Sequence, residues 1–187
     1  MADEHASLAQ DRVGGVIWQT SFSTLGRAAR KRTRANHVRG IEFYNRVKSA
    51  DPSTAAFLVV LLASSGLESD ATLKDKASLS ALVSGTTDEA TNTGYARKVL
   101  VAADIAALPS PDNTNDWWQV TIPNQTWSAV SNDGTGAIGK LVICYRPATG
   151  SADSAVIPLT AHDFSVTPNG GSIATVVDSN GFYRAGE

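Results

Sequence analysis

Short runs of apolar residues, separated by turn residues, dominate the chain from residue 55 onward. Every position in 57–62 is apolar, so we expect a strand that is covered on both faces, by the core and by a helix, an arm or another subunit. The clearest strand of the chain lies at 138–146. Further strands are predicted over 95–101, 118–122, 126–130, 155–159, 164–166, 173–177 and 182–184. Short strands joined by Gly and Asn turns predict a mainly β fold, an antiparallel β-sandwich of jelly-roll or immunoglobulin-like type.

Local signals add a hairpin and two helices to this pattern. The turn at Pro123 and Asn124 predicts that strands 118–122 and 126–130 pair with each other. One inserted helix is predicted over 70–84, with Thr72 as its N-cap and Gly85 at its end. A short amphipathic helix is predicted over 37–48, because apolar residues recur there at steps of three. These residues are Val38, Ile41, Tyr44 and Val47.

The first 35 residues are expected to be irregular or only partly helical. Trp18, Phe22 and Leu25 recur at helix-like spacing, and an isolated arm cannot bury them by itself. A partner surface is therefore expected to receive them. We divide the chain into a basic N-terminal arm with its short helix, residues 1–50, and a β-sandwich domain, residues 51–187.

Charge separates the same two parts of the chain. Segment 27–48 holds eight Lys or Arg residues and one acid, a net charge of +7, whereas 49–187 holds seven basic and fourteen acidic residues, a net charge of −7. The basic segment suits a solvated helix face, a contact with another subunit or a capsid, or, less favoured, nucleic acid. No aromatic residue interleaves with its arginines, which weakens a model of stacking on single strands. The candidate partner-binding residues of the arm are Trp18, Phe22, Leu25, Arg27, Arg30, Lys31, Arg32, Arg34 and Arg39.

Candidate chemistry is sparse. The one cysteine, Cys144, lies within a predicted strand and is expected to be buried, and the three histidines are scattered along the sequence. No nucleophile elbow, phosphate loop or dinucleotide fingerprint is present, so we expect no enzyme, no cofactor and no metal. His162-Asp163 is the one dipeptide suggestive of metal binding, and we interpret it as a turn.

A carbohydrate site is a remote alternative. Asp112 and Asp116 lie beside Trp117 and Trp118, and glycosidases use two carboxylates while aromatic rings stack on sugars. An exposed acidic loop with Trp118 in the core is the preferred interpretation of the same residues.

Two stretches of the chain carry a resemblance to a known family. The first contains GLESDATLKD at 66–75, SLSAL at 78–82 and TGYARK at 93–98; the second contains VIPLTAHDFSVTPNGG at 156–171 and NGFYR at 180–184. Together they resemble small β-rich virion structural proteins of tailed phages. The resemblance spans about 66–187 and implies no catalytic residues. It implies a virion component assembled in the host cytoplasm, without a membrane, whose partners are the major capsid protein or other virion subunits and further copies of itself. A capsid decoration (cement) protein is the favoured assignment, and a neck, collar or tail-attached protein is the alternative.

Overall fold

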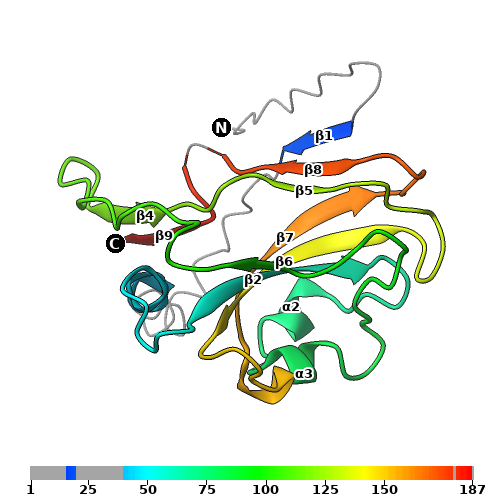
Figure 1. Cartoon of the computed structure of the whole chain (residues 1–187), viewed down its shortest axis with the longest axis horizontal. Coiled ribbons are helices and arrows are strands. Elements are labelled where there is room, and N and C mark those ends of the chain that lie inside the picture. Colours follow the sequence, from blue (N-terminus) through cyan, green and yellow to red (C-terminus); the bar gives the residue numbers. More distant parts are fainter. Residues whose placement is uncertain (1–15, 20–39, 179, 187) are drawn as a thin grey trace, which may run out of the picture.

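Strands in three sheets make up most of the regular secondary structure of the protein (Figure 1), in a computed structural model that describes residues 16–19, 40–178 and 180–186. The largest sheet is antiparallel and has the strand order β3-β2-β6-β7. Its strands are β2 (Ala56–Ala63), β3 (Lys98–Leu100), β6 (Ile138–Arg146) and β7 (Ile157–Val166). The prediction of a mainly β fold is confirmed.

Two smaller sheets complete the set of described strands. The order β1-β8-β5 joins β1 (Val16–Gln19), β8 (Ile173–Val176) and β5 (Gln125–Trp127), with β1 parallel to β8 and β5 antiparallel to it. A two-stranded antiparallel ribbon joins β4 (Trp117–Val120) to β9 (Tyr183–Gly186). No helix in the described part of the chain is long and apolar enough to cross a membrane.

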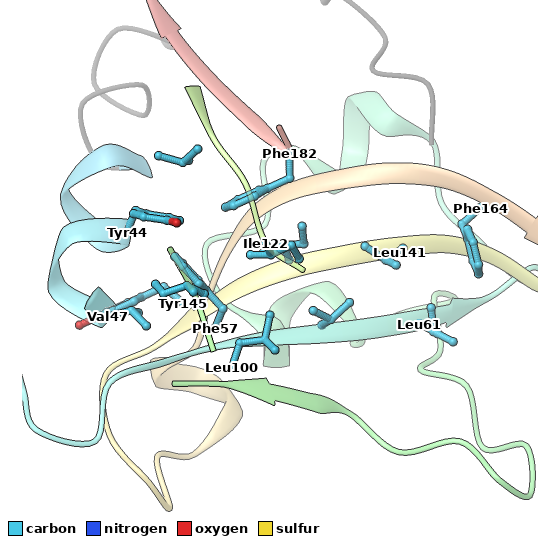
Figure 2. Packing of buried hydrophobic residues seen from close by; sticks show 14 of the residues in the cluster. Tyr44, Val47, Phe57, Leu61, Leu100, Ile122, Leu141, Tyr145, Phe164 and Phe182 are labelled. Atoms are coloured by element: carbon cyan, nitrogen blue, oxygen red, sulfur yellow. The ribbon is translucent and has the colours of Figure 1, made fainter. Parts of the chain in front are cut away.

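Strand β2 is buried along its whole length, as its sequence predicts. Phe57, Val59 and Leu61 point into the larger of two hydrophobic clusters (Figure 2). The alternate side chains point into a second cluster. Two short helices cover this cluster, which also contains Val142, Cys144 and Val156. These alternate residues are Leu58, Val60 and Leu62. The second cover that the sequence demands is therefore supplied within the chain by helices.

The inserted helix differs from its prediction. In place of one helix over 70–84, the chain forms two single turns, α2 (Asp70–Leu73) and α3 (Leu79–Leu82). Ser69 and Ser78 are the N-caps, not Thr72, and each side chain accepts a hydrogen bond from the N–H three residues later. Because Ser78 is extended in order to cap α3, it interrupts a continuous helix.

The predicted hairpin is wrong. β4 pairs with β9 near the C-terminus, and β5 pairs with β8. Asn124, just before β5, and Gln125, its first residue, are bonded to β8 and the residue after it. Gln125 N–H donates to Thr175 Oγ1, and Asn124 Oδ1 accepts from Val177 N–H. Because these long-range bonds hold the Pro123-Asn124 segment as a crossing between sheets, it does not close a tight turn.

The larger cluster gathers side chains from several elements. Ile143 comes from the four-stranded sheet and Trp127 from the three-stranded sheet, and both are at least 98% buried. A helix over 40–48 adds Tyr44 and Val47, whose exposure is 0%, and Phe43, whose ring stacks on Tyr145 at 4.3 Å. The helix that we assigned to the N-terminal arm therefore contributes to the core of the β-rich body (Figure 2).

Replacing Leu79 with alanine should test the helical cover of β2. Leu79 is fully buried in the second cluster, so we expect Leu79→Ala to reduce the free energy of unfolding by about 2–4 kcal/mol. The neighbouring Ser80 is exposed on the same turn, and Ser80→Ala should change stability by less than about 0.5 kcal/mol. Urea denaturation of both variants measures the difference, and equal stabilities would contradict this packing.

Candidate interaction surface

Among the described residues, strand β3 ends the four-stranded sheet and pairs with β2 alone. Val99 in the middle of this strand is 43% exposed and Val101 just after it is 41% exposed; these are the exposed large hydrophobic side chains of the described surface. Val99 pairs with Leu58, so it lies on the face of the sheet that carries the second cluster. Leu100 and Lys98 point to the other face, where the Lys98 ammonium lies 5.5 Å from the ring centroid of Trp127. Strand β3 thus exposes an apolar side chain on one face, and on the other face it packs against the core through Leu100 and contacts Trp127 through Lys98.

Arg97 fixes the start of β3 through two carboxylates. Its Nε donates to Glu89 Oε1 at 2.8 Å, and its Nη1 donates to Asp153 Oδ1 at 2.7 Å. The three side chains are only 20–34% exposed. The hydrogen bond that Arg97 donates holds the pKa of Asp153 below its usual value, and the hydrogen bonds that Arg97 donates to Asp153 and Glu89 raise its own pKa. One guanidinium is therefore held between two carboxylates, and the three side chains together carry a net charge of −1.

The β4–β9 ribbon forms a second surface feature, at the left of Figure 1. Asp112, Asp116, Trp117 and Trp118 line a shallow concavity of about 270 Å³, so the structure brings together the residues of the carbohydrate alternative. The guanidinium of Arg184 stacks 3.7 Å from the ring centroid of Trp117 and occupies one face of that indole. Stacking of a sugar on Trp117 is accordingly restricted.

The chemistry of this concavity is that of a tied loop. Asp112 accepts hydrogen bonds from the Asn115 side chain and from the backbone N–H groups of Thr114 and Asn115, and these bonds lower its pKa. A carboxylate held in its ionised form is a poor general acid. Trp118, which we expected in the core, is only partly buried against it, and its Nε1 donates to the carbonyl of Pro109.

His162-Asp163 lies inside β7 rather than in a turn, which corrects our interpretation. His162 is 7% exposed, and its Nε2 lies 2.9 Å from Thr160 Oγ1. Asp163 points outward and forms an ion pair with Lys140, which also contacts Asp70 at 2.7 Å. The described residues contain no group of three or more His, Cys, Asp or Glu side chains arranged to hold a metal ion.

Cys144 is buried, as its strand position predicts. Its exposure is 0%, and burial raises its pKa to about 12. A thiol in this environment is not ionised at neutral pH, and the thiolate is the nucleophilic form. Cys144 therefore acts as a small apolar side chain in the second cluster.

Most of the predicted arm residues lie outside the described part of the chain. These are Phe22, Leu25, Arg27, Arg30, Lys31, Arg32, Arg34 and Arg39. The backbone of Trp18 is described, and it belongs to β1, where Trp18 pairs with Thr175 in a parallel ladder. The spacing of Trp18, Phe22 and Leu25 predicts helical turns, but Trp18 is in a strand, because backbone pairing with β8 imposes an extended conformation.

Comparison of the chain with protein-family models, with curated proteins and with solved structures finds no match. The interpretation of its surface therefore depends on the residues described above.

A pH titration of stability should report His162. Burial lowers its pKa to about 4, with Lys140 lowering and Asp163 raising it by smaller amounts. Because the folded value lies below the ordinary value of 6.5, the stability contributed by the neutral ring is present above pH 6.5 and is lost as pH falls toward 4. Between pH 6.5 and 4 we expect the free energy of unfolding of the wild type to fall by about 2–3 kcal/mol more than that of His162→Gln. Urea unfolding across pH 4–7 measures it, and parallel profiles for the two proteins would contradict the assignment.

The Arg97 cluster should stabilise the fold more than a surface pair does. Arg97→Met leaves Glu89 and Asp153 partly buried without their cation, so we expect a loss of about 1–3 kcal/mol of unfolding free energy. Arg46 pairs with Glu42 on the exposed face of the 40–48 helix, both being 46% exposed, and Arg46→Met should cost about 0.5 kcal/mol or less. Thermal unfolding of the two variants compares them. Equal losses would show that the cluster is no stronger than the exposed pair.

Proposed function

We propose that this chain is a structural component of a tailed-phage virion, and specifically a capsid decoration (cement) protein anchored through its N-terminal segment. The observation that carries the proposal is the open β3 edge, where Val99 and Val101 are exposed beside a well-packed core. Proteins that act alone usually protect such edges, whereas a subunit of an assembly needs surfaces for its neighbours.

The resemblance of residues 66–187 to small β-rich virion proteins supports the proposal, and so does the architecture. Side chains of the three-stranded and four-stranded sheets, Trp127 and Ile143 among them, meet in one hydrophobic cluster. We propose on this basis that the two sheets form a β-sandwich of jelly-roll or immunoglobulin-like type. A compact sandwich displayed on a shell presents its loops and edges to solvent and to neighbouring subunits.

The charge distribution supports attachment through the N-terminal segment. The net charge of +7 on residues 27–48 would be attracted to an acidic capsid exterior. The net charge of −7 on residues 49–187 would be repelled by the same surface, so the basic segment and not the body would make the contact. In a symmetric shell, many copies of a weak arm contact produce a durable attachment. A neck or collar position would use the same arm between ring subunits.

Neutralising the arm tests the proposal in the full-length chain. We expect substitution of Arg30, Lys31, Arg32 and Arg34 by glutamine to weaken binding to virions that lack the protein by about 10-fold or more, because each lost charge removes attraction to an acidic surface. Lys74→Gln, an exposed basic residue of the body, is the control and should bind as the wild type does. Co-sedimentation with purified particles measures both.

Two results would contradict this account. Unchanged attachment of the neutralised variant would remove the arm as the anchor. Salt-sensitive binding of the wild type to DNA, lost in the same variant, together with no binding to particles, would assign the segment to nucleic acid instead.

A further inference from the structure

We infer that Lys140 and Asp163 become joined by an isopeptide bond, an amide between the lysine Nζ and the aspartate Cγ, with Asp70 as the proton carrier. The inference goes beyond the proposed function and does not depend on it. Three observations support it. The two groups that react face each other across adjacent strands, a second carboxylate contacts the amine, and the lysine is held in place by the surrounding fold.

Lys140 and Asp163 lie directly opposite each other in the ladder that joins β6 to β7. The Nζ of Lys140 contacts Oδ1 of Asp163, so the nucleophilic and the electrophilic group already meet in the folded chain. Well-oriented groups within one molecule react as if at an effective concentration of about 10⁵–10⁸ M. Condensation of a free amine with a free carboxylic acid is unfavourable in dilute water, and an effective concentration of that size reverses the balance.

The lysine has little freedom to leave this position. Lys140 is 6% exposed, and it also lies opposite Leu62 of β2, whose side chain belongs to the second hydrophobic cluster. The preceding residue, Gly139, is packed so closely that a Cβ there would lie 2.9 Å from Leu67 and 3.1 Å from the Cα of Ser64. The segment between β2 and α2 therefore lies directly against β6 beside Lys140 (Figure 1).

The ladder is irregular where Lys140 enters it. The pairing of β6 with β7 shifts between Ile138 and Lys140. Irregularities of this kind re-aim a side chain and leave local backbone groups outside the ladder. A covalent bond between Lys140 and Asp163 would thus fasten β7 to β6 at a point where their backbone pairing is interrupted.

Asp70 can supply the acid–base function that the reaction needs. It is the first residue of α2, and its Oδ1 lies 2.7 Å from the Nζ of Lys140. Burial lowers the pKa of Lys140, but the hydrogen bonds to Asp163 and Asp70 outweigh this effect and raise it, so the resting amine carries its proton. Attack requires the neutral amine. Asp70 is placed to take that proton and to deliver it to the departing oxygen.

The atoms and charges balance without a further reactant. The ammonium of Lys140 gives one proton to Asp70, and the neutral Nζ then forms a bond to the Cγ of Asp163. A second proton from Nζ and the proton held by Asp70 pass to one oxygen of Asp163, the bond from Cγ to that oxygen breaks, and water leaves. Asp70 returns to its ionised form, and the product is a neutral amide. The Asp163 side chain is 76% exposed, which leaves the water a path to solvent.

The mass of the intact full-length protein tests the inference. We expect the purified chain to be lighter than its sequence by the mass of one water molecule, with Lys140 and Asp163 recovered in one branched peptide after digestion. Lys140→Arg and Asp163→Ala should each restore the sequence mass. Lys76→Arg is the matched control and should keep the lighter mass. Lys76 also pairs with a partly buried carboxylate, Glu68 at 3.2 Å, but among the described residues it forms no ion pair with a second one.

Two further variants test the role of Asp70. Asp70→Ala removes the proton carrier and should leave the freshly purified chain at its sequence mass, whereas Asp70→Glu retains a carboxylate and should restore the lighter species. Urea unfolding of both variants shows that the fold is retained. Complete cross-linking of the folded Asp70→Ala chain would overturn the role of Asp70.

Three results would overturn the bond itself. The first is a wild-type chain at its sequence mass. The second is a loss of water that persists in Lys140→Arg, which keeps the positive charge but not the reactive amine, because such a loss would be a dehydration elsewhere in the chain. The third is a branched peptide that joins Lys140 to Asp70 in place of Asp163. Each of these results leaves the proposed function standing.

Discussion

The burial of β2 on both faces is the constraint on which the rest of this structure depends. All eight of its residues are at most 3% exposed, and a strand of that kind needs two separate covers. One cover is the large cluster shared with the other sheet and the 40–48 helix, and the other is the pair of single-turn helices between β2 and β3. Removing either would expose a continuous row of apolar side chains to water.

The second cover has a consequence for the edge of the sheet. The chain leaves β2 after Ala63, forms α2 and α3, and returns to pair with β2 first at Glu89 and then over only three residues of β3. Arg97 holds this return in place by joining Glu89 to Asp153. In the part of the chain that the structure describes, the sheet therefore ends in a short strand that has a strand partner on one side only.

Local features could be predicted from the sequence, and distant pairings could not. The two-sided strand at 57–62 and the burial of Cys144 follow from unbroken or alternating apolar residues, and Asp112 and Trp117 lie together because they are neighbours in the chain. The pairing of β4 with β9, and the contact of Arg97 with Asp153 across 56 residues, have no local signal. The predicted 70–84 helix is divided at Ser78. A serine can lie inside a helix or, as here, adopt an extended conformation and cap a new one, and the sequence does not distinguish the two.

The open edge was missed for a related reason. Val99 and Val101 alternate with Lys98 and Leu100, which predicts a strand with one buried face, but alternation does not tell whether the strand lies inside a sheet or at its end. That position is decided by which segments pair with β2. The paired residues of β3 are 39 or more positions away in the sequence, and those of β6 are 75 or more positions away. The interaction surface that we propose is thus a property of topology more than of any motif.

The number of copies of the chain in purified virions tests the central claim most directly. Quantitative mass spectrometry of particles, with the major capsid protein as the internal standard, should give copies on the order of hundreds, as a symmetric shell requires of a decoration protein. About a dozen copies or fewer would contradict the shell assignment and place the chain at the neck or tail. Absence of the chain from purified particles would contradict a structural role in the virion altogether.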